Sequence, residues 1–293
     1  MFEGTYTALV TPFTRGKFDE VRFRELIQAQ AKGGVSGIVP VGTTGESPTL
    51  ATEEHLKVIE TAVDAAKKTK LKVIAGSGAN STSEAIHLTQ GAEKLGADAS
   101  LQVAPYYNKP SQEGLFQHFR AIAKATQLPI ILYSIPGRCN VSISVETVAR
   151  LQKACKNIVA IKEAGGDADR VSQLRQRLGP KFTILSGDDG LTLPFMAVGA
   201  KGVISVASNL LPKEMSQMVA HYAKGNHRQA LALHERLYPL FKAFFLETNP
   251  VPIKTAMALA GRIEPGLRLP LTPMAKDNVT LLKKALKAAN VKL

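Results

Sequence analysis

Short apolar runs rich in Val and Ile alternate with longer amphipathic segments through most of this 293-residue sequence. They recur about every 25 to 30 residues, which is the spacing of strand–helix units. Because they are nearly continuous in apolar residues, they are typical of parallel strands buried on both faces. Eight such runs occur, at residues 6–13, 37–42, 72–78, 99–106, 129–135, 158–164, 182–187 and 202–207. The repeat predicts an α/β fold, a (β/α)8 TIM barrel.

The end of the chain has a different pattern, because only helical periods follow the eighth run. They lie at residues 213–223, 227–246, 252–260 and 273–289. We therefore expect a barrel over residues 1–224 and a C-terminal helical appendage over residues 225–293. No Gly/Ser-rich linker separates the two parts of the sequence, which predicts that the appendage packs on the barrel.

Charge and cysteine content indicate which partners and which cellular compartment suit this chain. Lys and Arg number 37 against 24 Asp and Glu, a net charge of +13. The basic residues are scattered among acids and the chain has no Trp, so the charge indicates an ordinary surface that favours small anions, and we expect no nucleic-acid partner. Two cysteines are too few for a disulfide framework, which fits the cytoplasm. The first residues lack the pattern of a signal peptide, and no run is long enough for a membrane span.

The usual cofactor motifs are missing from the sequence. The glycines near residue 76 lack the last glycine of a dinucleotide-binding fingerprint, and no Walker loop occurs. The six histidines fall in helical segments without the spacing of metal ligands: His55, His87, His118, His221, His227 and His234. We therefore expect neither a metal nor a nucleotide cofactor.

Polar residues collect where the predicted strands end. The active site of such a barrel lies at the carboxyl ends of the strands, so these residues are candidates for chemistry. The segments are 42–47 (GTTGES), 105–108 (PYYN), 133–138 (YSIPGR) and 186–189 (SGDD).

Lys162 is the most informative candidate, because it interrupts an apolar strand, IVAIKEA over residues 158–164. Burial disfavours the charged ammonium and lowers the pKa of a lysine. The resulting free amine can attack a ketone and form a Schiff base. The alternative is a lysine that extends to the strand end or pairs with a nearby carboxylate.

Other strand-end residues suit the recognition of carboxylates and the transfer of protons. Thr43 and Thr44 lie in a Gly-flanked loop that opens a helix, where amides and hydroxyls could hold a carboxylate or simply cap a turn. The phenols of Tyr107 and Tyr133 could relay protons or merely border the barrel. Arg138 could bind a carboxylate through its guanidinium fork, or lie on the surface.

Several of these motifs, taken together and in this order, resemble the dihydrodipicolinate synthase family, within the N-acetylneuraminate lyase superfamily of class I aldolases. The resemblance runs essentially from end to end. It is carried by ALVTPF at 8–13, VGTTGES at 41–47, APYYN at 104–108, IKEA at 161–164 and LSGDD at 185–189.

The resemblance implies a reaction and a residue for each step, without a cofactor. Lys162 would form a Schiff base with pyruvate, and Thr43 and Thr44 would contact the pyruvate near Gly187 and Ile204. The enamine would then add to L-aspartate 4-semialdehyde and close to (4S)-4-hydroxy-2,3,4,5-tetrahydrodipicolinate, the first committed intermediate of lysine synthesis through diaminopimelate.

The resemblance also implies a proton relay and a quaternary structure. Thr43, Tyr133 and Tyr107 would pass protons, with Tyr107 reaching into the neighbouring subunit's site across a tight dimer of a homotetramer, a dimer of dimers. Arg138 would bind the carboxylate of the semialdehyde. The neuraminate lyases and sugar-acid aldolases generally lack this arginine, so Arg138 favours the synthase over that alternative. A non-catalytic metabolite sensor would not need Lys162 and both tyrosines together.

Feedback inhibition by L-lysine is a further implication. In inhibited members of the family an allosteric pocket at the dimer interface uses positions that match Ser47, Pro48, His55, Asn80, Glu84 and Tyr106. Thr52 stands where some inhibited enzymes have histidine. The alternative is that these residues only cap and pack helices.

Three residues depart from the usual pattern of the family at the end of the fifth run. Ser134 replaces the more usual asparagine, and Cys139 and Asn140 replace threonine and glycine. We expect these changes to affect the positioning of substrate and to leave the Schiff base intact.

Overall fold

The computed structural model describes residues 2–292, and within them eight parallel strands close into a barrel. Each strand pairs with its neighbours in the chain, and β1 closes the sheet by pairing with both β10 and β4. The barrel strands are β1 (Gly4–Ala8), β4 (Gly37–Val39), β5 (Lys72–Gly76), β6 (Ala99–Val103), β7 (Ile130–Ser134), β8 (Ile158–Glu163), β9 (Thr183–Ser186) and β10 (Gly202–Ser205). The TIM barrel predicted from the repeat is confirmed.

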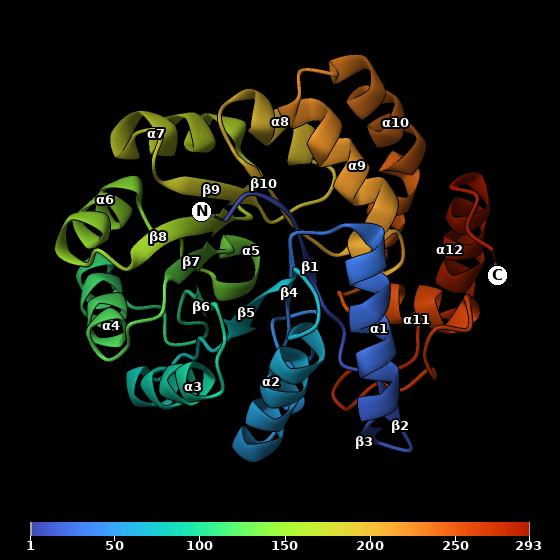
Figure 1. Cartoon of the computed structure of the whole chain (residues 1–293), viewed down its shortest axis with the longest axis horizontal. Coiled ribbons are helices and arrows are strands. Elements are labelled where there is room, and N and C mark those ends of the chain that lie inside the picture. Colours follow the sequence, from blue (N-terminus) through green and yellow to red (C-terminus); the bar gives the residue numbers. More distant parts are fainter. Residues whose placement is uncertain (1, 293) are drawn as a thin grey trace.

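Helices surround the strands (Figure 1) because each buries one apolar face against the sheet and leaves a polar face in water. In α4, for example, Ser111 caps the N-terminus, and Leu115, Phe119 and Ile122 form the buried face. The elements are α1 (Glu20–Gly33), η1 (Ser47–Thr49), α2 (Thr52–Ala66), α3 (Thr82–Lys94), α4 (Gln112–Lys124), α5 (Pro136–Cys139), α6 (Val145–Ala154), α7 (Ala168–Leu178), α8 (Thr192–Ala197), η2 (Ala207–Asn209) and α9 (Pro212–Ala223).

The first apolar run is the one place where a predicted strand divides. The expected strand over 6–13 is wrong in its second half, because β1 ends at Ala8 and Phe13 belongs to a separate hairpin of β2 (Phe13–Thr14) and β3 (Lys17–Phe18). The intervening residues are apolar for another reason. Leu9 and Val10 are buried in a cluster that includes side chains of the C-terminal helices.

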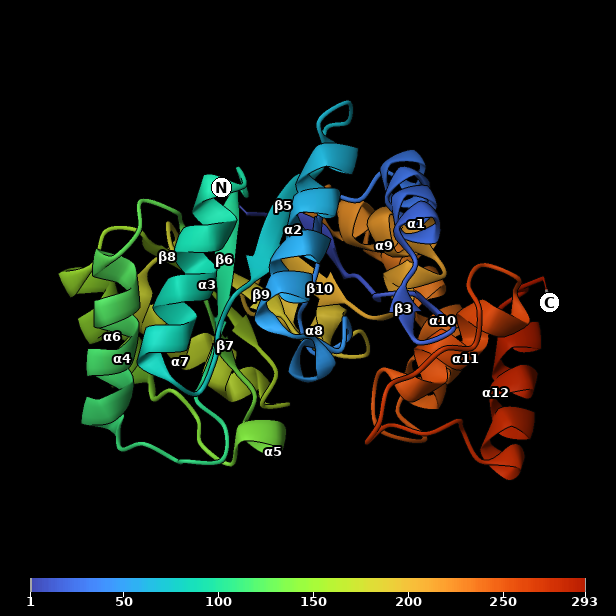
Figure 2. The same cartoon turned by 90° about the horizontal axis from the view of Figure 1, so that it is seen from below.

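The C-terminal helices α10 (His227–Ala243), α11 (Val251–Leu259) and α12 (Lys276–Ala288) lie to one side of the barrel, beside α9 and α1 (Figure 2). Phe241, Met257 and Leu282 from these helices share one hydrophobic cluster with Leu9 and Val10. The appendage therefore packs on the barrel, and a boundary at residue 224 stays a prediction. Among residues 2–292, none of the helices has the length and apolar character that a membrane crossing requires.

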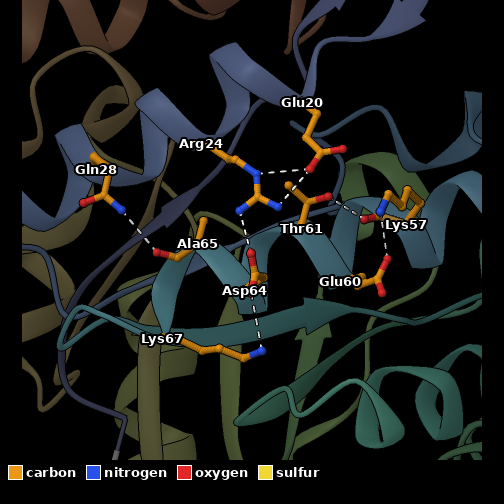
Figure 3. Close-up of polar contacts among 9 residues, drawn as sticks. All are labelled: Glu20, Arg24, Gln28, Lys57, Glu60, Thr61, Asp64, Ala65 and Lys67. Atoms are coloured by element: carbon orange, nitrogen blue, oxygen red, sulfur yellow. Dashed lines mark hydrogen bonds and ion pairs between the residues drawn. The ribbon is translucent and has the colours of Figure 1, made fainter.

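Helices α1 and α2 are joined on the surface by a network of charges (Figure 3). Arg24 pairs with Glu20 at 2.8 Å and with Asp64 at 2.7 Å, and all three side chains are well exposed. Water screens such pairs, so they add little to stability. The two helices are held mainly by the buried cluster beneath, to which α1 contributes Phe23 and α2 contributes Ile59.

A buried ion pair joins the appendage to the loop after β4. Nζ of Lys254 on α11 lies 2.5 Å from Oε1 of Glu46, and their side chains are 1% and 0% exposed. Lys254 also donates to the carbonyl of Thr11 at 2.9 Å, and the backbone N–H of Arg268 donates to Glu46 Oε2 at 3.2 Å. The ammonium of Lys254 and the guanidinium of Arg268 both lie over the ring of Phe13. This network connects the first residues of the chain, the β4 loop and the C-terminal part.

We predict that Lys254→Met lowers the free energy of unfolding by about 3–5 kcal/mol, because it leaves the Glu46 carboxylate buried without its partner. Arg24→Met, which removes the exposed pairs of Arg24 with Glu20 and Asp64 drawn in Figure 3, is the control and should cost much less. Urea titration followed by circular dichroism measures both losses. Equal losses in the two variants would contradict the structural importance of the buried pair.

Candidate active site

A cavity of about 280 Å³ lies at the carboxyl ends of the strands. Residues near the ends of four strands form part of its wall: Val39 of β4, Gly76 of β5, Val103 of β6 and Lys162 of β8. Of the candidates taken from the sequence, the cavity brings together Thr43, Thr44, Tyr133, Arg138 and Lys162. The position is the one that barrel active sites occupy.

Lys162 is the buried cation of this cavity, with 7% of its surface exposed. It lies on β8, paired with Tyr133 of β7 on one side and Leu185 of β9 on the other. Burial lowers its pKa to about 7, the charge of Arg138 acts in the same direction, and Asp189 opposes both. At pH 7 roughly half of the amine is then neutral, against about one part in 3000 at the ordinary pKa of 10.5.

The ring of Tyr133 lies beside this amine. Nζ of Lys162 lies 4.1 Å from the centroid of the Tyr133 ring. Burial raises the pKa of the phenol to about 12, and a hydrogen bond with Thr43 moderates the rise. The phenol therefore stays protonated near neutral pH and can donate a proton to a group formed at Lys162.

Thr44 and Arg138 both contact Asn249, a residue that sequence reasoning missed. The Asn249 side-chain Nδ2 donates to Thr44 Oγ1 at 2.9 Å, and Arg138 Nη2 donates to the Asn249 carbonyl at 2.9 Å. Asn249 lies just before α11 and is buried. Its only signal in the sequence is a polar residue beside proline between two helical periods.

The end of β9 fits closely around Lys162. A Cβ atom at Gly187 would lie 3.0 Å from Lys162 Cε and 2.7 Å from the Ala164 Cβ, so a larger residue would displace the lysine. Asp189 is buried, and its Oδ2 accepts the backbone N–H groups of Val206 and Ala207 at 3.0 and 2.8 Å. Burial raises the pKa of Asp189 to about 6.

Gly187, Ile204 and Tyr107 are catalytic or substrate-binding candidates that do not line the cavity. Ile204 is in the barrel interior, in one buried cluster with Tyr133. Tyr107 is 91% exposed and has a φ of +74°, in the left-handed region that disfavours side chains. Within the described part of this single chain, Tyr107 is therefore not assembled with Lys162.

Five of the six expected allosteric residues line the same cavity or lie beside Tyr106 at its wall. Ser47, Pro48 and Tyr106 line it, and Asn80 Nδ2 donates to the Tyr106 carbonyl at 3.2 Å. Burial raises the pKa of the Tyr106 phenol, and the negative charge of Glu84 raises it further. Glu84 lies in the first turn of α3.

His55, the remaining member of that set, is built into the fold. Its Nε2 lies 2.8 Å from the carbonyl oxygen of Gly76, at the end of β5. The ring is buried, and burial lowers its pKa, so it stays neutral near pH 7. His55 supports the strand end that forms part of the cavity wall.

The three departures at the end of the fifth run lie around the segment that carries Arg138. The backbone N–H of Ile143 donates to Ser134 Oγ at 3.4 Å, while Asn140 caps α5 in a left-handed conformation. Cys139 lines the cavity, and burial raises the pKa of its thiol to about 11, which keeps it protonated. Between residues 2 and 292, His, Cys, Asp and Glu side chains form no group of three that could hold a metal ion.

Comparison with known proteins gives a consistent result over the full length. Residues 1–289 match the model of the dihydrodipicolinate synthetase family. Two curated relatives, both named 4-hydroxy-tetrahydrodipicolinate synthase, come from Sulfurihydrogenibium sp. and Aquifex aeolicus. The first is 54% identical over 288 residues, with 98% of each chain covered. The second is 50% identical over 293 residues, covering 100% of this chain and 99% of the relative.

Solved structures agree. The 4-hydroxy-tetrahydrodipicolinate synthase of Methylacidiphilum fumariolicum has a TM-score of 0.98 at 54% identity, covering 99% of this chain and 96% of that one. The enzyme of Cyanidioschyzon merolae, solved with lysine bound, has a TM-score of 0.96 at 43% identity and 99% coverage of both. A variant described as the first monomeric dihydrodipicolinate synthase has 0.96 at 42%, covering 99% of this chain and 98% of that one.

We predict that Lys162 reacts with an amine reagent at lower pH than other lysines, because only the neutral amine is nucleophilic and its pKa is about 7. Competitive acetylation read by peptide mass spectrometry should give half-maximal labelling of Lys162 near pH 7. Lys57, whose pKa is raised by an ion pair with Glu60, is the control and should label only in strong alkali. Coincident profiles for the two lysines would contradict the free-amine interpretation.

Proposed function

The chain belongs to the dihydrodipicolinate synthetase family, and we propose that it uses Lys162 to condense pyruvate with L-aspartate 4-semialdehyde through a Schiff base. The product is (4S)-4-hydroxy-2,3,4,5-tetrahydrodipicolinate, in the first committed step of lysine synthesis through diaminopimelate. The observation that carries the residue assignment is a buried lysine with a pKa near 7, beside a protonated phenol in a cavity at the strand ends.

The first half of the reaction follows from the chemistry of these groups. The neutral amine of Lys162 attacks the ketone carbon of pyruvate, and loss of water leaves the Schiff base. Tyr133 supplies a proton to the departing oxygen, and Thr43, hydrogen-bonded to Tyr133, passes protons onward. The deprotonated Tyr133 then takes a methyl proton from the Schiff base, which becomes an enamine as the phenol is restored. Thr44 holds the pyruvate carboxylate.

The second half joins the two substrates. The enamine carbon attacks the aldehyde of L-aspartate 4-semialdehyde, whose carboxylate is bound by Arg138 at the cavity wall. The amino group of that substrate then displaces the Lys162 nitrogen as the ring closes, which releases the product and regenerates the free amine. No cofactor takes part in this proposal.

Arg138 distinguishes this reaction from the sugar-acid aldolase alternative. Its guanidinium lines the cavity and is anchored to the Asn249 carbonyl. An anchored guanidinium matches the planar carboxylate of the semialdehyde, whereas a sugar acceptor such as N-acetylmannosamine offers hydroxyl groups instead.

Tyr107 supports a quaternary proposal. An aromatic side chain that is 91% exposed in a left-handed backbone conformation costs free energy in an isolated chain. We propose a homotetramer, a dimer of dimers, in which Tyr107 enters the partner subunit's cavity and joins the Thr43–Tyr133 relay. Sedimentation velocity tests the assembly, and a monomer with full activity would overturn it.

Feedback inhibition by L-lysine is the regulatory proposal. Tyr106, Asn80 and Glu84 lie together and offer an amide and a carboxylate, which suit the carboxylate and ammonium of an amino acid. Ser47 and Pro48 line the cavity beside Tyr106, so a ligand there would touch the wall of the active site. Calorimetric titration with L-lysine tests this proposal, and absence of heat at millimolar lysine would overturn it.

Two coarser proposals concern the chain as a whole. The buried, free thiols of Cys139 and Cys155 support a reducing cytoplasm, which cell fractionation would check. We place the boundary between barrel and appendage at residue 224, in the turn between α9 and α10. Limited proteolysis tests this boundary, and a first cleavage at another position would contradict it.

Turnover is the experiment that tests the function. We expect the purified protein to consume pyruvate with L-aspartate 4-semialdehyde and not with N-acetylmannosamine. Borohydride added with pyruvate alone should place a three-carbon adduct on Lys162, seen by peptide mass spectrometry. Turnover with the sugar alone would favour the aldolase alternative, and an adduct on another lysine would remove the central assignment.

We predict that Arg138→Ala raises the KM for the semialdehyde roughly tenfold or more, because a charge-assisted hydrogen-bonded pair is lost. The KM for pyruvate should change much less, since pyruvate is held by Thr43 and Thr44. Initial rates with each substrate varied in turn measure both constants. An equal rise in the two constants would count against the assigned role.

A further inference from the structure

Asn249 is the part of the appendage that reaches the substrate-binding groups. It lies about 200 residues from Thr44 in the sequence, yet its Nδ2 donates to Thr44 Oγ1 at 2.9 Å. Its main-chain carbonyl anchors Arg138 at 2.9 Å. Both partners line the cavity, and Thr44 and Asn249 are buried.

The amide of Asn249 is only half satisfied. Its Oδ1 is buried and finds no hydrogen-bond partner among residues 2–292. A buried polar atom without a partner is costly, and such groups call for an explanation in function or strain. Across the residues that the structure describes, the one hydrogen bond that this amide makes comes from its other end, where Nδ2 meets Thr44 Oγ1.

The direction of the hydrogen bond decides what Thr44 can do. A hydroxyl has one hydrogen to donate and lone pairs to accept with. Because Thr44 Oγ1 accepts from Asn249, its own hydrogen stays free to donate elsewhere. The group that needs such a donor in this cavity is an anion, the carboxylate of the first substrate.

We propose that Asn249 is a positioning residue that holds the Thr44 hydroxyl as a hydrogen-bond donor toward the pyruvate carboxylate. This inference rests on the proposed function, and deepens it by explaining how the active site selects a 2-keto acid. The same residue anchors Arg138 through its main chain, so one turn of the appendage organises the contacts to both anionic substrates.

Asn249→Asp is the sharpest test, because it keeps the size of the side chain and removes its donors. An ionised carboxylate can only accept hydrogen bonds. The Thr44 hydroxyl must then donate its hydrogen to the new Asp side chain, and it can no longer donate that hydrogen to the substrate. We expect the KM for pyruvate to rise about tenfold or more, with kcat at saturating pyruvate within about threefold of the parent. Asn249→Ala frees the hydroxyl without capturing its hydrogen, so its KM should rise less.

Thr44→Val shows whether the effect passes through the hydroxyl. In that background Asn249→Asp should add little to the KM for pyruvate, because no hydroxyl remains to be captured. An undiminished effect of Asp in the Thr44→Val background would mean direct charge repulsion and would overturn the proposal. An unchanged KM in both single variants of Asn249 would overturn it as well.

Asn209 offers a matched control. It is equally buried, and its amide bonds only main-chain groups, including the Ala8 carbonyl at 2.7 Å and the Val10 N–H at 3.0 Å. Asn209→Asp should lower the thermal midpoint while leaving the KM for pyruvate within about twofold. If the parent protein itself fails to consume pyruvate with the semialdehyde, the proposed function fails. A parent that turns over, with Asn249 variants that match it, removes this inference alone.

Discussion

The buried pair of Glu46 and Lys254 is the contact on which the arrangement of the site depends. Glu46 belongs to the same loop as Thr43 and Thr44, and its backbone is held in the left-handed region at a φ of +56°. A carboxylate in that position is tolerable only because a cation and a main-chain N–H meet it there. The loop that carries Thr43 and Thr44 at the cavity wall is thus held by a helix outside the barrel.

Burial has different outcomes for the two buried lysines that this fold uses. Lys254 has a carboxylate oxygen at 2.5 Å, and the attraction of Glu46 works against the lowering of its pKa by burial. Lys162 experiences Asp189 as an opposing charge, while burial and Arg138 together bring its pKa to about 7. The same residue type therefore forms a buried ion pair in one place and carries an amine with a lowered pKa in the other, according to the nearest charges.

Sequence reasoning reached the barrel and much of its cavity because both obey local rules. The repeat of apolar runs located the strands, and the strand-end rule pointed to Lys162 and Arg138, which the structure brings to one cavity. The roles of Asn249 and Lys254 could not be predicted from the sequence, because these residues contact the loop after β4 only through tertiary packing across more than 200 residues. Lys254 did carry a readable signal, a lone lysine in an otherwise apolar helix, which is the same signal that singled out Lys162. The proposed role of Tyr107 requires a second chain, which no pattern within one chain can supply.

Because the first apolar run ends its strand at Ala8, the residues that follow pack on C-terminal helices that are synthesised much later. Leu9, Val10 and Thr11 are synthesised more than 200 residues before their partners in α10 and α11. Domains generally fold as units. A nascent chain that already contains every barrel strand therefore still lacks the contacts that Asn249 and Lys254 make with the loop after β4. A product that stopped at the end of α10 would contain Lys162 without Asn249 and Lys254, which contact Thr44 and Glu46 of the loop after β4.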